Sequence, residues 1–92
     1  MVLSKNFELT DIAGENLAIP VGSLAEKYKA VIALSEASAF LLSQLKQPKT
    51  SAELVSLLTQ EFDVSVEQAE ADVKEAVEKY TKLGLITNDD QP

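Results

Sequence analysis

The chain has 92 residues, which is enough for one hydrophobic core and too few for two domains of ordinary size. Its charged residues are 8 lysines against 15 aspartates and glutamates, and the resulting net charge of −7 argues against binding to the phosphates of nucleic acids. Because the sequence contains no cysteine, it excludes disulfides, thiolate zinc sites and thiol nucleophiles, and because it contains no histidine, it lacks the commonest general base and metal ligand, so most catalytic templates are not available to it.

Membrane and metal sites are also unexpected. No apolar run approaches the roughly 20 residues that a membrane helix needs, and the first residues are too few and too polar for a secretory signal. We therefore expect a cytoplasmic location. No loop has the alternating oxygen ligands of a calcium-binding hand, so we expect neither a metal nor a cofactor.

The first third of the chain predicts a β-hairpin. Apolar residues alternate in Phe7–Ala13 and again in Asn16–Val21, and Gly14–Glu15 between them supplies a residue that tolerates positive φ. Pro20 cannot donate to a ladder, which places it at a strand end or on an edge. The polar connection Ser23–Lys29 has room for one helical turn before the next strand.

A third strand is predicted over Ala30–Leu34, a run of apolar residues without a charge, which indicates a strand with protein on both faces. From Ser35 the apolar spacing becomes helical, and Ser35 is suited to accept a hydrogen bond from the first free amides of a helix. This first helix is predicted from Glu36 to about Lys46, before Pro48. The strand therefore passes directly into a helix.

Two further helices are predicted, each opened by a capping box, in which Thr50 pairs with Glu53 and Ser65 pairs with Gln68. The buried stripe of the second helix comprises Leu54, Leu57, Leu58 and Phe62. The third helix, Val66–Leu83, has a stripe at helical spacing over nearly five turns that comprises Val66, Ala69, Val73, Val77, Tyr80 and Leu83. Gly84 suits the left-handed position after it, and Leu85–Ile86 are expected to pack back on the core, as a small strand.

The order of these elements defines an α+β fold, with an N-terminal three-stranded antiparallel sheet followed by three helices. It is compatible with a winged helix, because the second and third helices have helix-turn-helix spacing. We expect one domain over residues 1–92, with a core at about 7–86 and a tail at 87–92.

The chain resembles the PqqD family, whose small peptide-binding domains are also called RiPP recognition elements. The resemblance covers roughly Phe7–Ile86 and depends on the order and spacing of six segments: Ile12–Asn16, Ile19–Gly22, Ile32–Leu41, Ser51–Leu58, Ala71–Val73 and Gly84–Ile86. One departure is Ser35, where such domains often have asparagine, although either residue caps a helix.

The resemblance implies a winged-helix-like domain without catalysis of its own. Such domains bind the leader segment of a ribosomally made precursor peptide and present the peptide to a modifying enzyme, often a radical SAM enzyme. The leader is held as an extra antiparallel strand on the third strand, with its apolar side chains against the third helix. In this sequence the matching edge is Ala30, Val31, Ile32, Ala33 and Leu34, and the matching helix is Val66–Leu83.

The residues themselves are consistent with such a receptor. The third predicted strand has no proline, lysine or glutamate of the kind that protects edges from pairing. On the third helix, Ala69 and Ala76 are small and seven positions apart, which predicts a shallow apolar trough flanked by Val73 and Leu83, with Asp72 and Lys79 on its polar rim. A leader side chain buried there would gain about 1.5–3 kcal/mol.

Other interpretations of these residues stay open. The run Ala30–Leu34 is equally typical of a central strand without a free edge, and the two alanines are equally typical of close helix packing. Asp72 is also typical of a solvated helix position, paired with Lys74 or Lys79. An exposed edge could also pair with itself, so the chain is expected to be either a monomer or an edge-mediated or swapped homodimer.

Three other functions compete with peptide binding. A DNA-binding winged helix or a general protein-interaction domain fits the helix-turn-helix spacing, but the helix that would enter DNA, Val66–Leu83, has five acidic residues against three lysines. An acyl carrier would need a serine after an aspartate, and the sequence contains no such pair. An enzyme would have to work with carboxylates, lysines or tyrosines alone, and no pair of them stands out.

Overall fold

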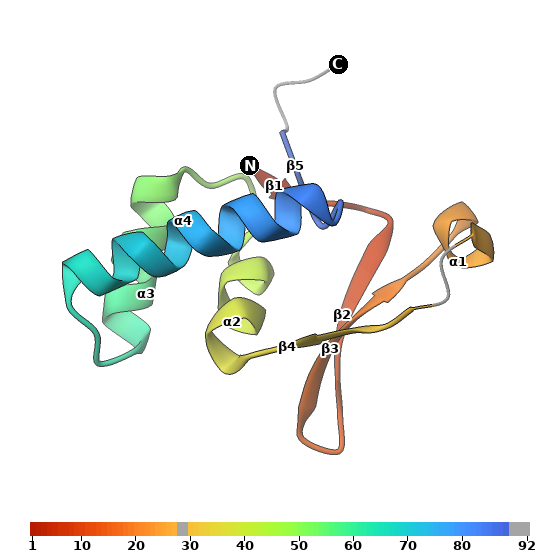
Figure 1. The fold of residues 1–92 in the computed structure, drawn as a ribbon, viewed down its shortest axis with the longest axis horizontal. Helices are drawn as coiled ribbons and strands as arrows, with labels where there is room; N and C mark the ends of the chain where they lie inside the picture. The colour runs from red at the N-terminus through yellow and green to blue at the C-terminus, as the bar shows by residue number, and fades with distance from the viewer. Residues whose placement is uncertain (28–29, 89–92) are drawn as a thin grey trace.

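The computed structural model describes residues 1–27 and 30–88, and Figure 1 shows the order of their helices and strands. The elements are β1 (Val2–Leu3), β2 (Phe7–Ile12), β3 (Glu15–Pro20), α1 (Ser23–Lys27), β4 (Ile32–Leu34), α2 (Glu36–Gln44), α3 (Ser51–Glu61), α4 (Val66–Lys82) and β5 (Ile86–Thr87). The strands β2, β3 and β4 form an antiparallel sheet in that order, and the three longer helices follow. The predicted α+β fold is therefore confirmed, and α1 is the helical turn expected between the second and third strands of that sheet.

The hairpin forms as predicted, with its turn one residue earlier. Strands β2 and β3 pair from Phe7 opposite Pro20 to Ile12 opposite Glu15, so Glu15 belongs to a strand and Ala13–Gly14 make the turn. Both turn residues have positive φ, 53° and 85°, as the mirror-image turns of two-residue hairpins require. Pro20 is the last residue of β3, in agreement with its predicted place at a strand end.

Strand β4 is shorter and more exposed than its sequence predicts. It begins at Ile32, so Ala30 and Val31 precede it, and it pairs with β3 from Ile32 opposite Ala18 to Leu34 opposite Asn16. Leu34 is buried, but Ala33, whose side chain points to the other face, is exposed. The expectation of protein on both faces is therefore wrong, because only the face that carries Leu34 contributes to the hydrophobic core.

Side-chain caps begin each of the three longer helices. Ser35 Oγ accepts a hydrogen bond from Ser38 N at 3.1 Å and starts α2. At α3 the predicted capping box is confirmed, with both reciprocal bonds present between Thr50 and Glu53. At α4 the predicted capping box is wrong, because only one of its two hydrogen bonds forms. Gln68 N donates to Ser65 Oγ, but the Gln68 side chain turns forward along the helix and donates to Asp72 instead.

The end of α4 returns the chain to the core. Gly84 has φ of 87°, and Leu85 N donates to Tyr80 O at 2.8 Å while Gly84 N donates to Thr81 O, which is a Schellman motif. Leu85 and Ile86 are buried, as predicted. Strand β5 then pairs with β1, a strand that no sequence pattern indicated.

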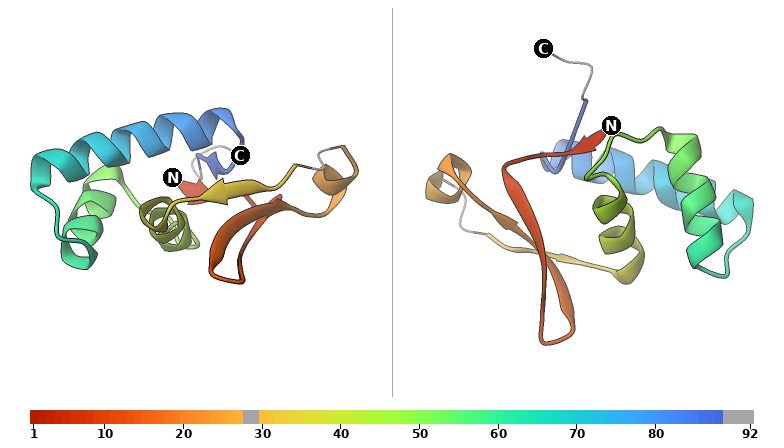
Figure 2. Two further views of the ribbon diagram at one scale, coloured as in Figure 1. Left: turned by 60° about the horizontal axis from the view of Figure 1, so that its bottom comes forward. Right: turned by 180° about the vertical axis from the view of Figure 1, so that it is seen from behind.

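One hydrophobic core joins the sheet to the helices. It comprises Phe7, Ala18, Leu34, Leu41, Leu42, Leu45, Leu54, Leu58, Ala69, Val73, Tyr80, Leu85 and Ile86. The predicted stripe of α4 fails at its two ends, because Val66 and Leu83 are 56% and 40% exposed. These residues occupy the first turn and the C-cap of the helix, where fewer neighbours surround a side chain. Figure 2 shows α2 between the sheet on one side and the α3–α4 pair on the other.

Candidate functional site

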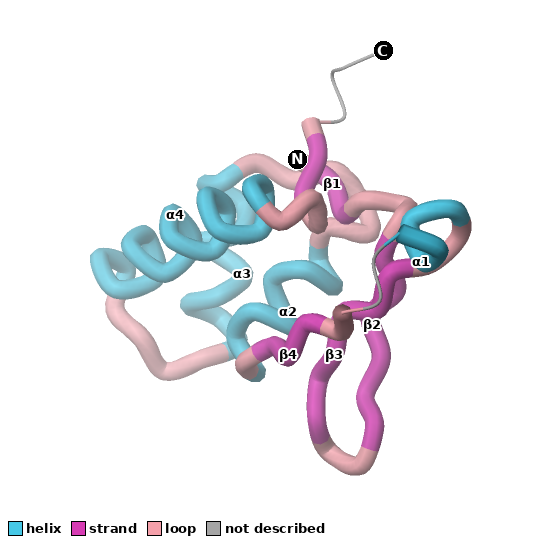
Figure 3. The backbone as a smooth tube through the Cα atoms, turned by 45° about the vertical axis from the view of Figure 1, so that its right-hand side comes forward, coloured by secondary structure: helices cyan, strands magenta, loops and turns pink. Residues whose placement is uncertain are grey.

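Strand β4 lies at the margin of its sheet. The strand order β2-β3-β4 means that, within residues 1–27 and 30–88, β4 pairs with β3 alone. Figure 3 shows this margin on the side of the sheet that lies toward the helices. At such a margin, alternate residues point backbone N–H and C=O groups away from the sheet, where they are available to another strand.

The other margin of the sheet, β2, is less suited to pairing. Its sequence includes Glu8 and Asp11, and charged side chains are a common protection of edges against added strands. β4 has no charged residue. The two margins therefore differ in chemistry, and only β4 lacks the charged side chains that oppose a further strand.

A groove of about 370 Å³ lies beside β4, between that strand, the start of α2 and one side of α4. We call it the β4–α4 groove. Its lining comprises Ala33, Ser35, Ala37, Ser38, Leu41, Asp72, Glu75, Ala76, Lys79 and Tyr80. This volume is at the low end for ligand pockets, which suits one or two side chains of a peptide better than a large cofactor.

Small and apolar residues form the floor of the groove. Leu41 and Tyr80 are 4% and 3% exposed and belong to the core, so they close the groove from below. Ala37 and Ala76 are half-buried on its two sides. Because an alanine has only a methyl group, these two positions leave space that a larger residue would fill.

Charged residues of α4 form the rim. Asp72 is half-buried, and its Oδ1 accepts a hydrogen bond from Gln68 Nε2 at 2.8 Å, which holds the carboxylate in one orientation. Glu75, one turn further along, is exposed. The Lys79 ammonium lies 5.4 Å from the centroid of the Tyr80 ring, close enough for a cation–π contact. The rim is thus acidic toward the start of α4 and basic toward its end.

The predicted site residues do not all meet at this groove. Asp72, Ala76 and Lys79 of α4 line it together with Ala33 of β4. The other predicted residues of the edge lie elsewhere, since Ile32 and Leu34 point to the opposite face from Ala33, and Ala30 and Val31 are exposed before the strand.

The remaining predicted residues of α4 are in the core. Ala69 and Val73 are 0% and 1% exposed and contribute nothing to the lining of the β4–α4 groove. Val73 instead borders a larger cavity of about 500 Å³ between α3 and α4. That cavity is lined by helical residues only, so it offers a ligand no unpaired strand.

Six lining residues were not among the predicted site residues, namely Ser35, Ala37, Ser38, Leu41, Glu75 and Tyr80. The sequence could have placed Glu75 at the groove, because this residue is three positions after Asp72 and four before Lys79, on the same side of α4. The sequence indicated the α2 residues less clearly. They follow β4 without a loop, so the start of α2 necessarily lies beside the end of that strand.

Two other classes of site lack support in the part of the chain that the structure describes. No group of three or more carboxylates is arranged to hold a metal ion. No helix there combines the length and the apolar character that crossing a bilayer requires.

Comparison with known proteins identifies the family. The family model described as coenzyme PQQ synthesis protein D (PqqD) matches residues 21–86, more than two thirds of the chain. The chain belongs to the PqqD family. The match includes β4, α2 and α4, and with them every lining residue of the β4–α4 groove, whereas β1 and both strands of the hairpin, β2 and β3, lie outside it. No curated protein is a significant match to the sequence.

Two solved structures share the fold of this PqqD-family chain. One is TbiB1 in complex with the TbiA(beta) leader peptide, with a TM-score of 0.73, 18% identity and coverage of 92% of this chain and 93% of that one. The other is lasso peptide synthetase B1 complexed with the leader peptide, with a TM-score of 0.72, 17% identity and coverage of 94% and 95%. At this identity the similarity establishes a common fold.

Proposed function

We propose that this chain binds the leader segment of a ribosomally synthesised precursor peptide as an added strand on β4. The observation that carries the proposal is the coincidence of an uncharged, exposed strand edge with the β4–α4 groove beside it. Strand addition draws affinity from main-chain hydrogen bonds and specificity from pockets for alternate side chains, and this arrangement supplies both.

The comparisons support the proposal from a separate direction. PqqD-family membership and the shared fold connect the chain to two proteins whose structures contain leader peptides. The energetics agree as well. Each apolar leader side chain buried in the groove contributes about 1.5–3 kcal/mol, and ordering the peptide costs about 2–5 kcal/mol, so two such anchors with a few backbone bonds give at most about micromolar affinity.

The chain would act as a non-catalytic adaptor. The groove contains no histidine or cysteine, and its charged groups are spread along a rim instead of converging on one reacting atom. The chemistry would therefore belong to a separate modifying enzyme, for which a radical SAM enzyme is one candidate, and this chain would present the bound precursor to it.

A DNA-binding role is the alternative that the fold permits, because α3 and α4 have helix-turn-helix spacing. Charge opposes it. α4 has five acidic residues against three lysines, and the sequence contains no arginine, a residue that usually contributes to phosphate binding. A salt-sensitive complex with mixed-sequence duplex DNA would reverse this preference.

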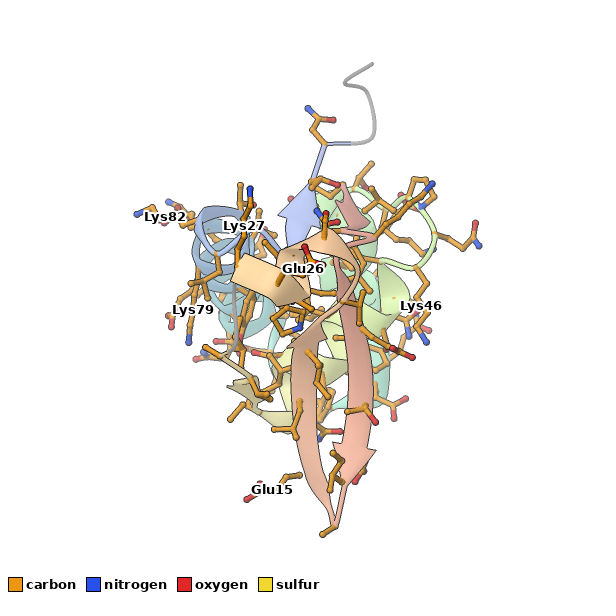
Figure 4. All side chains as sticks on the ribbon, turned by 90° about the vertical axis from the view of Figure 1, so that its right-hand side faces the viewer. Glu15, Glu26, Lys27, Lys46, Lys79 and Lys82 are labelled. Atoms are coloured by element: carbon orange, nitrogen blue, oxygen red, sulfur yellow. The ribbon has the colours of Figure 1, made fainter. Side chains whose placement is uncertain are left out.

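The test of the proposal is an NMR titration of the isotope-labelled chain with the synthetic leader of the precursor encoded beside its gene. We expect amide shifts at Ile32–Leu34 and along the groove side of α4, around Ala76. The surface near Lys46, on the opposite flank from Lys79 in Figure 4, serves as the internal control and should not respond. Saturating leader without any shift at Ile32–Leu34 would overturn the proposal.

A further inference from the structure

The rim of the β4–α4 groove has opposite charges at its two ends, and this inference, which rests on the proposed function, concerns the leader that such a rim selects. We propose that the preferred leader has a basic residue, an apolar residue two positions later and an acidic residue two positions after that. In the bound strand the basic residue meets Asp72 and Glu75, the apolar residue lies between Ala33 and Ala76, and the acidic residue meets Lys79.

The direction of the bound leader follows from the relative directions of α4 and β4. In Figures 1 and 2 the two elements run in opposite directions. The acidic end of the rim, Asp72, therefore lies toward the end of β4, where Ser35 and Ser38 complete the lining, and the basic end lies toward the start of β4. A strand that pairs antiparallel with β4 runs in the same direction as α4, so its N-terminal half meets the acidic end.

The spacing of the three leader residues follows from the geometry of the helix α4 and of an extended leader strand. Asp72 and Lys79 are seven residues apart in α4, which is about 10 Å along the helix axis. An extended chain advances about 3.3 Å per residue and points alternate side chains to the same face, so residues four apart span about 13 Å. The flexible lysine and glutamate side chains of the leader compensate for the difference between these two lengths. The leader residue midway between the lysine and the glutamate then faces the alanine-lined part of the groove.

The fixed geometry of the acidic end strengthens the selection. The hydrogen bond from Gln68 holds one oxygen of the Asp72 carboxylate, and a carboxylate retains further acceptor capacity for a basic side chain. At the other end, the contact with the Tyr80 ring keeps the Lys79 ammonium beside the groove. Both charges are therefore partly ordered before a peptide arrives, which lowers the entropy that binding costs.

The experiment compares two short peptides of identical composition. The forward peptide has lysine, leucine and glutamate at alternate positions in an otherwise threonine-rich sequence, and the reversed peptide exchanges the lysine and the glutamate. We expect the forward peptide to bind about tenfold more tightly at low salt, where exposed charges are least screened. The preference should shrink at high salt, because the selection is electrostatic.

Charge-exchange variants assign the effect to the rim. The double variant Asp72→Lys with Lys79→Glu should prefer the reversed peptide, whereas Lys46→Glu, a charge reversal on the opposite flank, should retain the forward preference. Equal affinity for the two peptides, tighter binding of the reversed peptide, or an unchanged preference in the double variant would overturn the inference. If neither peptide binds while the natural leader shifts Ile32–Leu34, the inference fails and the proposed function stands. If the natural leader gives no such shift either, both fail.

Discussion

Two turns on one side of α4 differ in burial although they carry the same small residue. Ala69 and Ala76 are identical side chains seven positions apart, and their spacing places them on nearly the same side of the helix. Ala69 is completely buried in the core, whereas Ala76 is half-buried and lines the β4–α4 groove. The same small residue therefore serves close packing in one place and lines an open groove in the other, according to what lies opposite.

The largest expected effect comes from enlarging the buried alanine. Ala69→Leu inserts additional carbon atoms where no space exists, so we expect the free energy of unfolding to fall by about 1–3 kcal/mol. Ala71→Leu is the matched control, since Ala71 is exposed on the same helix and should change stability by less than about 0.5 kcal/mol. Urea denaturation measures both. If the two variants are equally stable, the assignment of Ala69 to a close-packed core position is wrong.

The next effect should appear in binding instead of stability. Ala76→Leu fills part of the groove, so we expect leader affinity to fall about tenfold, or about 1.4 kcal/mol, with a smaller change in unfolding free energy than Ala69→Leu. Isothermal titration calorimetry with the same leader measures the affinity, and Ala71→Leu again serves as the control. Wild-type affinity in Ala76→Leu would mean that the leader lies elsewhere.

A smaller effect concerns the hydrogen bond at the acidic end of the rim. Gln68→Ala releases the Asp72 carboxylate, and Gln60→Ala removes a similar bond from Gln60 Nε2 to Ser56 Oγ on α3. Both variants should lose about 0.2–0.5 kcal/mol of stability, as is usual for side-chain pairs one turn apart. Only Gln68→Ala should weaken binding of a peptide with a basic residue at its N-terminal end. Equal affinities in the two variants would remove Gln68 from the site.

The smallest effect distinguishes the two helix caps by their response to pH. The Thr50 backbone N–H donates a hydrogen bond to Glu53 Oε1, and this bond, together with a smaller effect of the Thr50 side chain, lowers the pKa of the Glu53 carboxyl. The corresponding residue at the start of α4, Gln68, has no titratable group. A lowered pKa in the folded state adds stability above the unfolded pKa of glutamate, about 4.3, and this stability is lost as pH falls through the folded pKa.

Stability measurements on Glu53→Ala as a function of pH test that sign. The variant should be less stable than wild type at neutral pH, and the gap should close as the solution becomes more acidic than the usual pKa of glutamate. Its leader affinity at neutral pH should be unchanged, since Glu53 is not among the lining residues of the groove. A gap that is constant with pH would contradict the assigned role of the carboxylate.

The sequence predicted those parts of the fold that local chemistry determines. The hairpin, the cap at Ser35, the capping box at Thr50 and the end of α4 at Gly84 each depend on residues a few positions apart, and the structure confirms them. Strand β1 was missed because its partner β5 lies more than eighty residues later, and a two-residue strand has no periodicity of its own.

The site was only partly predictable for a related reason. Helical spacing identifies which residues of α4 share a side, but Ala69 and Ala76 share it equally, and only the position of β4 and α2 separates core from groove. The apolar run at Ala30–Leu34 was ambiguous between a central and an edge strand, because composition does not reveal how many neighbours a strand has. Only the strand order places Ile32–Leu34 at a margin.

Amide hydrogen exchange with and without bound leader peptide tests the central claim most directly, because it reports which margin of the sheet gains hydrogen bonds. An added strand on β4 should slow exchange at one or more amides of Ile32–Leu34, while the amides of Phe7–Ile12 on the opposite margin keep their rates. Unchanged exchange throughout Ile32–Leu34, or protection gained only at Phe7–Ile12, would contradict the account.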